Sequence, residues 1–328
     1  MDVWIALATI LAVVLVIWLS CRSAEQLNPS GRAVFISGCD TGIGQRLAIH
    51  FSGLGCEVFA GCLDPEKAKS GLPDGVHAVP LDVTNEESVT KAVEAVKERL
   101  EQNKKDLWAL VNNAGVCVCG FFEWQTWLQC ERQVQVNLLG TMRITKACLP
   151  LLRKMKGRLI TISSINGSIS YPGLSVYCAT KHALEGLHDS LRVELGLQHG
   201  IRAILVQPGD YARATAIMSQ HDRNASDMWE GMAQQDRDGS NGDLFKKYHR
   251  QTRKNYGLTS PGSLDGADVV KDVEDAVLGL CPKDRYVSAS KVMKLVYKVL
   301  AICPTKVSDA LLGKVVRVMM NSDDKEED

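Results

Sequence analysis

Tyr177 and Lys181 are the two residues whose types and spacing most directly indicate chemistry. They lie four positions apart in the stretch 176–198, which is predicted to be helical, so their side chains share one face. A phenol has a pKa of about 10 and is a poor base at neutral pH, but a nearby ammonium group stabilises the phenolate and lowers that pKa. The pair therefore predicts acid/base chemistry, although the same spacing alone also fits an ordinary helix face.

A glycine-rich loop follows the first apolar strand-like stretch, residues 33–37. Gly38, Gly42 and Gly44 precede a predicted helix, and this placement is typical of a loop that holds a pyrophosphate at a helix N-terminus. The spacing is GxxxGxG rather than the GxGxxG of other dinucleotide-binding proteins. The loop therefore predicts a dinucleotide cofactor.

The elements that must position these residues alternate between apolar strands and helices. Strands that are apolar throughout and separated by helices imply a parallel sheet covered on both faces. We therefore expect an α/β protein with one doubly wound parallel sheet. The predicted strands are 33–37, 57–61, 76–81, 107–111, 158–162 and 202–206, and the helices are about 45–54, 86–100, a long one ending near 155, and 176–198.

Composition excludes several functional classes. The 328 residues include 38 basic and 38 acidic side chains, so the net charge is zero and no nucleic-acid partner is expected. The eleven cysteines form no CxxC motif and no zinc-ligand spacing, so no metal site is expected. Their scatter through apolar stretches favours buried free thiols in a reducing compartment.

The N-terminus has the composition of a membrane anchor. Residues 3–21 carry no charge, and a helix of that length spans the hydrocarbon core of a bilayer. Trp4 and Trp18 fall near its two ends, as expected for interfacial aromatic residues. A cleaved signal peptide is the alternative, but the Met1-Asp2 start lacks the basic residues that such a peptide carries. Arg22 and Arg32 after the segment favour a cytosolic position for the rest of the chain.

The order of the motifs resembles that of the short-chain dehydrogenase/reductase family across residues 31–284. This resemblance implies a single Rossmann-fold domain and an NAD(P)-dependent oxidoreductase. It also implies that Tyr177 is the acid/base, that Ser164 binds the substrate oxygen, and that Asn137 holds a water that relays protons to Lys181. The motifs that carry it are the glycine loop, Asn112-Asn113-Ala114-Gly115, Asn137, Ser164 and Tyr177-Cys178-Ala179-Thr180-Lys181.

The second predicted strand indicates which nicotinamide cofactor binds. No Arg or Lys follows it to hold a 2′-phosphate, whereas Asp40 would repel one and Asp64 could accept from a ribose hydroxyl. NAD is therefore favoured over NADP. Asp82 resembles the acid that meets the adenine amino group, with a helix-capping or loop acid as the alternative. The expected cofactor-binding residues are Gly38, Asp40, Gly42, Ile43, Gly44, Asp64, Asp82, Val83, Asn113, Ala114, Gly115, Tyr177, Lys181, Pro208 and Gly209.

Within this family the chain resembles the branch of retinol, 17β-hydroxysteroid and 3-hydroxybutyrate dehydrogenases. A membrane anchor suits a lipophilic alcohol, so a retinol or hydroxysteroid is the expected substrate, bound by Ser164 and Tyr177. Many family members place a threonine five residues after the proline of the PG turn, where this chain has Arg213, and Thr215 is the nearest threonine. Arg213 is therefore a candidate carboxylate partner, which keeps (R)-3-hydroxybutyrate as the alternative substrate. An NAD-binding membrane scaffold is the non-enzymatic alternative.

The remaining segments flank this domain. We expect an anchor at 1–21, a linker at 22–30, a substrate-loop region at 210–261, an apolar and basic amphipathic segment at 285–320 and an acidic tail at 321–328. The amphipathic segment fits contact with membrane lipid. The endoplasmic reticulum membrane is the expected location, with mitochondria as the alternative. The resemblance also implies a homodimer that pairs through helices near 120–150 and 176–198.

Overall fold

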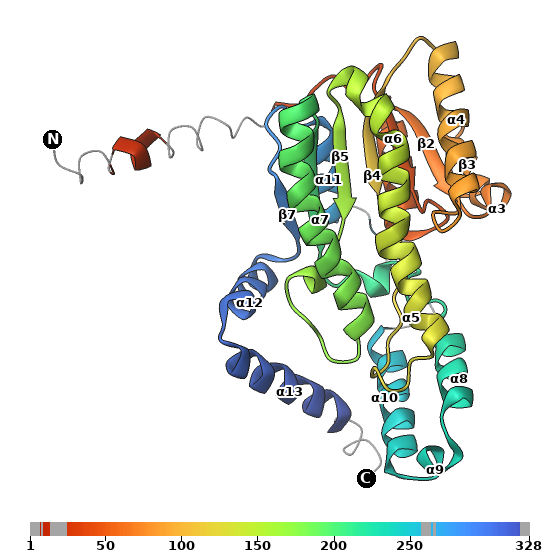
Figure 1. Cartoon of the computed structure of the whole chain (residues 1–328), viewed down its shortest axis with the longest axis vertical. Helices are drawn as coiled ribbons and strands as arrows, with labels where there is room; N and C mark the ends of the chain where they lie inside the picture. The colour runs from red at the N-terminus through yellow and green to blue at the C-terminus, as the bar shows by residue number, and fades with distance from the viewer. Residues whose placement is uncertain (1–6, 8, 14–24, 257–263, 265–266, 322–328) are drawn as a thin grey trace.

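The computed structural model describes residues 7, 9–13, 25–256, 264 and 267–321. Its centre is a parallel sheet with the strand order β3-β2-β1-β4-β5-β6-β7 (Figure 1). The strand order reverses between β1 and β4, so the chain leaves these two strands toward opposite faces of the sheet. In α/β folds, ligands bind at such a point, beyond the carboxyl ends of the strands. The strands are β1 (Ala33–Ser37), β2 (Glu57–Cys62), β3 (His77–Pro80), β4 (Leu107–Asn112), β5 (Arg158–Ile162), β6 (Arg202–Pro208) and β7 (Arg285–Ser288).

Helices cover both faces of the sheet and create two separate cores. Successive side chains of β1 alternate between them, so Val34 and Ile36 join one core while Ala33 and Phe35 join the other. This two-sided burial explains why the strand is apolar at nearly every position. The first core is covered by α2 (Gly42–Gly53), α3 (Pro65–Lys69) and α11 (Asp268–Leu278), and the second by α4 (Glu86–Gln102), α6 (Thr141–Met155) and α7 (Ser175–His199).

The expected doubly wound parallel sheet is confirmed, and all six predicted strands are present within two residues of their predicted bounds. The seventh strand, β7, is absent from the prediction. It has only four residues and its first residue is charged. It is the outermost strand on its side of the sheet and pairs with β6. Arg285 forms ion pairs with Glu185 and, at 2.9 Å, with Asp189 of α7. The sheet therefore continues past the expected domain boundary at 284.

A helical lid lies beyond the carboxyl ends of the strands (Figure 1). It follows β6, within the expected substrate-loop region 210–261, of which 257–261 lie outside the described residues. Met228 and Phe245 anchor it, because both are buried against Trp124 of the sheet domain. The lid consists of η3 (Ala212–Ala214), α8 (His221–Gly231), α9 (Gln234–Arg237) and α10 (Ser240–Tyr256).

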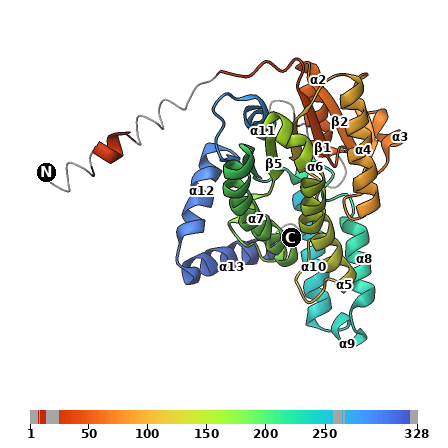
Figure 2. The ribbon, with the colours of Figure 1, turned by 45° about the horizontal axis from the view of Figure 1, so that its top comes forward.

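Two further helices, α12 (Lys291–Ile302) and α13 (Thr305–Asn321), follow β7. Figure 2 shows both beside α7, and α13 packs against α10. The acidic tail lies outside the described residues except for residue 321. Across the described ranges, no helix has the length and apolar character needed to cross a membrane. Most of the expected anchor, including both of its tryptophans, lies outside those ranges.

Candidate active site

The loops after β1 and β4 are tied together at the switch point of the sheet. The Ser37 hydroxyl accepts hydrogen bonds from the backbone N–H groups of Asn113 and Ala114, at 3.0 and 3.1 Å. In return, the Asn113 side-chain amide donates to the carbonyls of Ser37 and Gly38, both at 3.0 Å. The expected cofactor residues of the two loops are therefore brought together.

The glycines of this loop stand where no side chain fits. Gly38 has a φ of 71°, and a Cβ there would lie 2.7 Å from the Cα of Ala114. A Cβ on Gly44 would lie only 2.2 Å from the Gly38 carbonyl oxygen. The preceding Thr41 makes no side-chain cap hydrogen bond to α2, so the first amides of the helix remain available to an anion. These features fit the pyrophosphate of a dinucleotide.

The three acidic residues expected at the cofactor have local roles in the structure. The Asp40 carboxylate accepts from the backbone N–H groups of Leu63 and Asp64, at 3.1 and 3.0 Å, so it lies at the end of β2. Asp64 caps α3 by accepting from the Lys67 N–H. Asp82 accepts from both the N–H and the hydroxyl of Thr84. Two carboxylates therefore lie just beyond β2.

The remaining expected cofactor residues lie near the carboxyl ends of the same strands. Val83 is buried against Gly140, and Ile43 packs on the core from the first turn of α2. Pro208 ends β6, and the Gly209 N–H donates to the Ser288 carbonyl of β7. Thr215 lies against Gly42, where a Cβ would come within 3.3 Å of its side chain. Residues from both halves of the sheet thus lie at the carboxyl ends of the strands.

Tyr177 and Lys181 lie one turn apart near the start of α7, as their spacing predicts. Lys181 is 4% exposed, its Nζ donates to the Ile162 carbonyl at 3.1 Å, and it lies 5.6 Å from the centre of the Tyr177 ring. Burial lowers the pKa of Lys181 to about 8. Burial, together with the neighbouring Cys117 thiol, raises the pKa of Tyr177, whereas a hydrogen bond to the Ser164 hydroxyl lowers it.

Asn137 reaches the same site from a π-helical turn, η1 (Gln135–Gly140), which joins α5 (Trp127–Val134) to α6. Its side chain is fully buried and binds both backbone groups of Val116, at 2.8 and 2.9 Å, and the Thr180 hydroxyl at 3.1 Å. A Cβ on Gly115 would lie 3.5 Å from the Asn137 Oδ1 and 3.8 Å from the Lys181 Nζ. All four expected catalytic residues therefore converge, and π turns of this kind occur frequently at functional sites.

A small cavity lies beside Tyr177. Its volume is about 20 Å³, and Cys119 and Leu174 of its lining also pack against Tyr177. None of the described side chains that line it is charged. Arg213, the candidate carboxylate partner, is not part of this lining, because its Nε donates instead to the Asn255 carbonyl. Most of the lining is aromatic or polar but uncharged, from Tyr171, Tyr248, Gln251, Thr252 and Tyr256.

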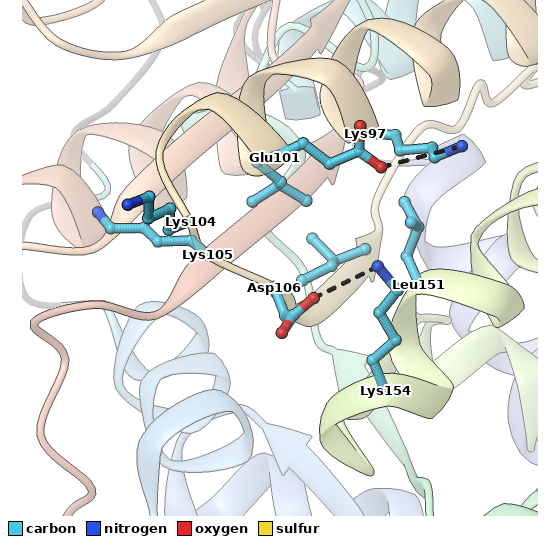
Figure 3. Close-up of a pocket in the computed structure, with 9 residues that line it drawn as sticks. Lys97, Glu101, Lys104, Lys105, Asp106, Leu151 and Lys154 are labelled. Carbon is cyan, nitrogen blue, oxygen red and sulfur yellow. Dashed lines mark ion pairs between the residues drawn. The ribbon is translucent and has the colours of Figure 1, made fainter.

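A larger cavity, of about 220 Å³, lies at the other end of the sheet, where the strands begin. Figure 3 shows residues that line it. Leu107, the first residue of β4, lines it, so it is at the amino ends of the strands. Lys97 pairs with Glu101 at 4.0 Å and Lys154 with Asp106 at 3.6 Å. Because its charges are largely paired and it touches none of the converging residues, this cavity is separate from the candidate active site.

Several residues of the site were not expected from the sequence. Ser37 stands inside a predicted strand, where a polar residue has no obvious partner, and its role depends on the neighbouring strand β4. Thr180 positions Asn137 from a different helix. Both residues are next in sequence to expected ones, Gly38 and Lys181. Their hydrogen-bond partners, however, lie far away in the sequence, so local patterns do not reveal these contacts. A polar residue at the last position of the first strand is the one signal that could have indicated Ser37.

Comparisons with known proteins agree with this geometry. The family model described as "short chain dehydrogenase" matches residues 32–225. The chain is 36% identical over 292 residues to the mitochondrial D-beta-hydroxybutyrate dehydrogenase of Rattus norvegicus, which covers 86% of this chain and 84% of that protein. It is 34% identical over 282 residues to Retinol dehydrogenase 7 of Mus musculus, with coverage of 85% and 87%.

Solved structures share the fold. A short-chain dehydrogenase/reductase from Burkholderia phymatum, in complex with NAD, has a TM-score of 0.67 at 18% identity and covers 88% of this chain and 96% of that one. A short chain dehydrogenase from Burkholderia cenocepacia, in complex with NADP, has a TM-score of 0.61 at 22% identity, with coverage of 87% and 99%. The sequence match, the sheet order and the site together lead to one conclusion: the chain belongs to the short-chain dehydrogenase/reductase family of NAD(P)-dependent oxidoreductases.

Proposed function

We propose that this protein is a membrane-associated, NAD-dependent dehydrogenase that interconverts a lipophilic alcohol, of the retinol or hydroxysteroid class, and its aldehyde or ketone. The observation that carries the proposal is the cavity beside Tyr177, which is lined by aromatic, thiol and uncharged polar side chains. A carboxylate substrate would lose its hydration there without gaining a cationic partner. A neutral alcohol has no such penalty.

In this proposal the Ser164 hydroxyl binds the substrate oxygen and Tyr177 exchanges a proton with it. The nicotinamide, when bound, supplies the hydride acceptor or donor. Lys181 stabilises the phenolate of Tyr177 through its charge, and a pKa of about 8 lets it pass a proton near neutral pH. Asn137 holds the backbone around Val116 in place. The side chains thus provide both an oxygen-binding group and a proton path.

The first prediction concerns the acid/base. We expect Tyr177→Phe to lower kcat for retinol or estradiol by roughly 10²- to 10⁴-fold, because proton transfer from a positioned side chain contributes that factor. The dissociation constant of NADH, followed by fluorescence, should change far less than kcat, because the phenol hydroxyl alone is removed. Initial rates of the wild type and the variant with NAD check this. Retained turnover in the variant would contradict the assignment of Tyr177.

The second candidate function is (R)-3-hydroxybutyrate oxidation, which the 36% identity to a D-beta-hydroxybutyrate dehydrogenase favours. The same assay separates the candidates. Turnover of (R)-3-hydroxybutyrate alone would overturn the lipophilic substrate, and Arg213→Ala should then raise KM for that acid. Tight NAD binding with no turnover of any of these alcohols would favour the scaffold alternative instead.

The preference for NAD rests on the end of β2. The Asp40 and Asp64 carboxylates lie there, where α/β dinucleotide-binding folds hold the adenosine ribose. Leu63 between these contacts is 72% exposed, so it can be replaced without disturbing the core. A basic side chain at this position would offset the two carboxylates and provide a partner for a 2′-phosphate.

We therefore expect Leu63→Arg to shift the ratio of kcat/KM for NADP to that for NAD upward by roughly tenfold, which corresponds to about 1.4 kcal/mol. Leu63→Gln is the matched control, since it is polar but uncharged. Steady-state rates with both cofactors at fixed alcohol check the ratio. Wild-type preference for NADP would contradict the proposed role of the carboxylates outright.

A further inference from the structure

We propose that α13 forms a movable wall of the substrate cavity and that Val316, on this helix, helps to determine which alcohols are accepted. This inference rests on the proposed function and extends it to a segment near the end of the chain. Val316 lines the cavity together with Cys119, Leu174 and three tyrosines. Among the described residues that line the cavity, Val316 alone comes from beyond β7 in sequence.

The face of α13 that meets the rest of the protein is defined by its burial pattern. Ser308, Leu312 and Val316 are half-buried, and they lie at four-residue intervals on one side of the helix. Val315 and Val318 beside them are exposed, at 46% and 61%. α13 packs against α10, which carries Tyr248, Thr252 and Tyr256 of the same cavity. The inner face of α13 is thus directed at the cavity.

The cavity is too small for the proposed substrate as the structure stands. Its volume is about 20 Å³, whereas sites for small organic ligands usually measure roughly 300–1,000 Å³. A retinol or hydroxysteroid can enter only if part of the lining moves. The question is therefore which wall is held least firmly.

The other walls are fixed by specific contacts. The Gly120 N–H donates to the Gly173 carbonyl at 2.9 Å, which joins the loop after β4 to the loop before α7. Tyr248 of α10 lies so close to Gly173 that a Cβ there would be 2.1 Å from the tyrosine hydroxyl oxygen. Trp124 also donates to the Asn241 side chain at 2.9 Å. These contacts hold α10 and both loops against the sheet domain.

In contrast, α13 is held loosely. Among residues 305–318, none has a buried side chain. Ser308 donates to the Leu300 carbonyl of α12, which connects the two terminal helices to each other rather than to the cavity. A segment with few buried contacts opens at a low free-energy cost. The geometry therefore points to displacement of α13 as the movement that admits the substrate.

The test compares Val316→Phe with Val318→Phe in the full-length protein. Both variants add the same ring to the same helix, but only the first directs it into the cavity. With retinol and estradiol, we expect Val316→Phe to raise KM by roughly tenfold or more, while the dissociation constant of NADH stays within twofold of the wild type. Val318→Phe should leave both quantities unchanged. Val316→Ala should lower KM for the bulkier of the two alcohols, and it guards against misfolding of the larger substitution.

Two outcomes distinguish failure of this inference from failure of the proposed function. If the wild type turns over retinol or estradiol and the two phenylalanine variants behave alike, α13 is not a wall of the working cavity. If the wild type turns over neither alcohol, the proposed function itself fails. Equal effects of Val316→Phe on KM and on NADH binding would also overturn the inference, because they would indicate a general structural disturbance.

Discussion

At the scale of single residues, the site combines groups that are unfavourable to bury. Lys181 lies in an almost dry environment with one hydrogen bond, to a backbone carbonyl, and three thiols, of Cys117, Cys119 and Cys178, surround Tyr177. Burial disfavours both the ammonium and the phenolate, so each is destabilised in the form that the chemistry uses. We infer that these two positions lower the stability of the fold and that the proposed reactivity explains why they are buried.

This trade predicts opposite effects of Lys181→Met on stability and on activity. Turnover should fall by at least about 10²-fold, while the free energy of unfolding at pH 7 should rise by about 1–3 kcal/mol. The folded-state pKa of Lys181, about 8, is below its ordinary value of 10.5. The unfolded chain therefore binds the proton more tightly, so the wild type becomes more stable as pH rises from 8 to 10.5 and the gain of the variant shrinks.

Urea unfolding of both proteins at pH 7 and pH 10 measures that difference. Lys298→Met, on exposed α12, is the matched control and should change neither activity nor stability by much. A Lys181→Met protein that is less stable than the wild type at pH 7 would show that the ammonium contributes net stability where it is buried.

Residue types in sequence order predicted much of the site and failed where a role depends on a partner. The glycine loop and the four-residue Tyr-Lys spacing are local patterns, so they could be found without a structure. The Asp64 carboxylate caps α3, a contact that depends on Pro65 starting a helix directly after it, and its place at the cofactor ribose stays a prediction. Ser37 acts only across the gap between β1 and β4.

At the scale of elements, two histidines join the helices of the lid. His249 of α10 and His221 of α8 are hydrogen-bonded at 2.9 Å, with Asp222 and Arg253 beside them. His221 is 3% exposed, and its Nδ1 has no hydrogen-bond partner among the described residues. Burial, with His249 and Arg253 adding to it, lowers the pKa of His221 to about 4, while Asp222 acts in the opposite direction.

We expect the contact between α8 and α10 to weaken as pH falls from 6.5 to 4. The folded pKa of His221 is below its ordinary 6.5, so His221 binds a proton more tightly when the lid is open than when it is closed. The free energy that stabilises the contact therefore falls by about 2 kcal/mol across that window. Hydrogen exchange of residues 221–256, corrected for intrinsic rates, measures it at pH 7 and pH 5. His221→Phe should remove most of the pH dependence, leaving the smaller part that His249 contributes, whereas His199→Phe, outside the lid, should not reduce it. An unchanged dependence in His221→Phe would contradict this origin.

Element prediction from sequence was successful wherever an element is apolar throughout. The other six strands of the central sheet could be predicted for this reason. β7 could not, because it has four residues, alternates in burial and begins with an arginine that pairs with Glu185. The lid helices are mostly polar, so the sequence between 210 and 256 fits a flexible lid and the packing of a short helix equally well. Their order comes from packing against Trp124, which lies about a hundred residues earlier and cannot be read from local pattern.

At the scale of the whole molecule, the two ends of the chain are the parts that suggest a bilayer. α12 exposes Val292, Leu295 and Ile302 at 70%, 64% and 82%, with lysines between them. Exposed apolar side chains interspersed with basic ones favour an anionic lipid surface. We propose that the segment 1–21 anchors the protein and that α12 rests on the same membrane. The expected homodimer and the endoplasmic reticulum location stay predictions.

Membrane fractionation tests this arrangement. The full-length protein should stay in the membrane pellet after alkaline carbonate, whereas a variant lacking residues 1–21 should be released by salt. In that variant, Leu295→Ser with Ile302→Ser should reduce binding to vesicles of anionic phospholipid by roughly tenfold, from lost apolar burial. Leu197→Ser, a control on α7 that replaces an equally exposed leucine, should not. Release of the full-length protein by carbonate would contradict the anchor.

The hydrogen bonds between Ser37 and the loop after β4 have a consequence for cofactor affinity. They link the loops after β1 and β4 through the protein's own groups, so both loops are held in place before any dinucleotide binds. The conformational entropy of ordering these loops is lost when the chain folds, and none of it is subtracted when the cofactor binds. Affinity for the dinucleotide is thereby uncoupled from the proposed displacement of α13, which only the proposed alcohol requires.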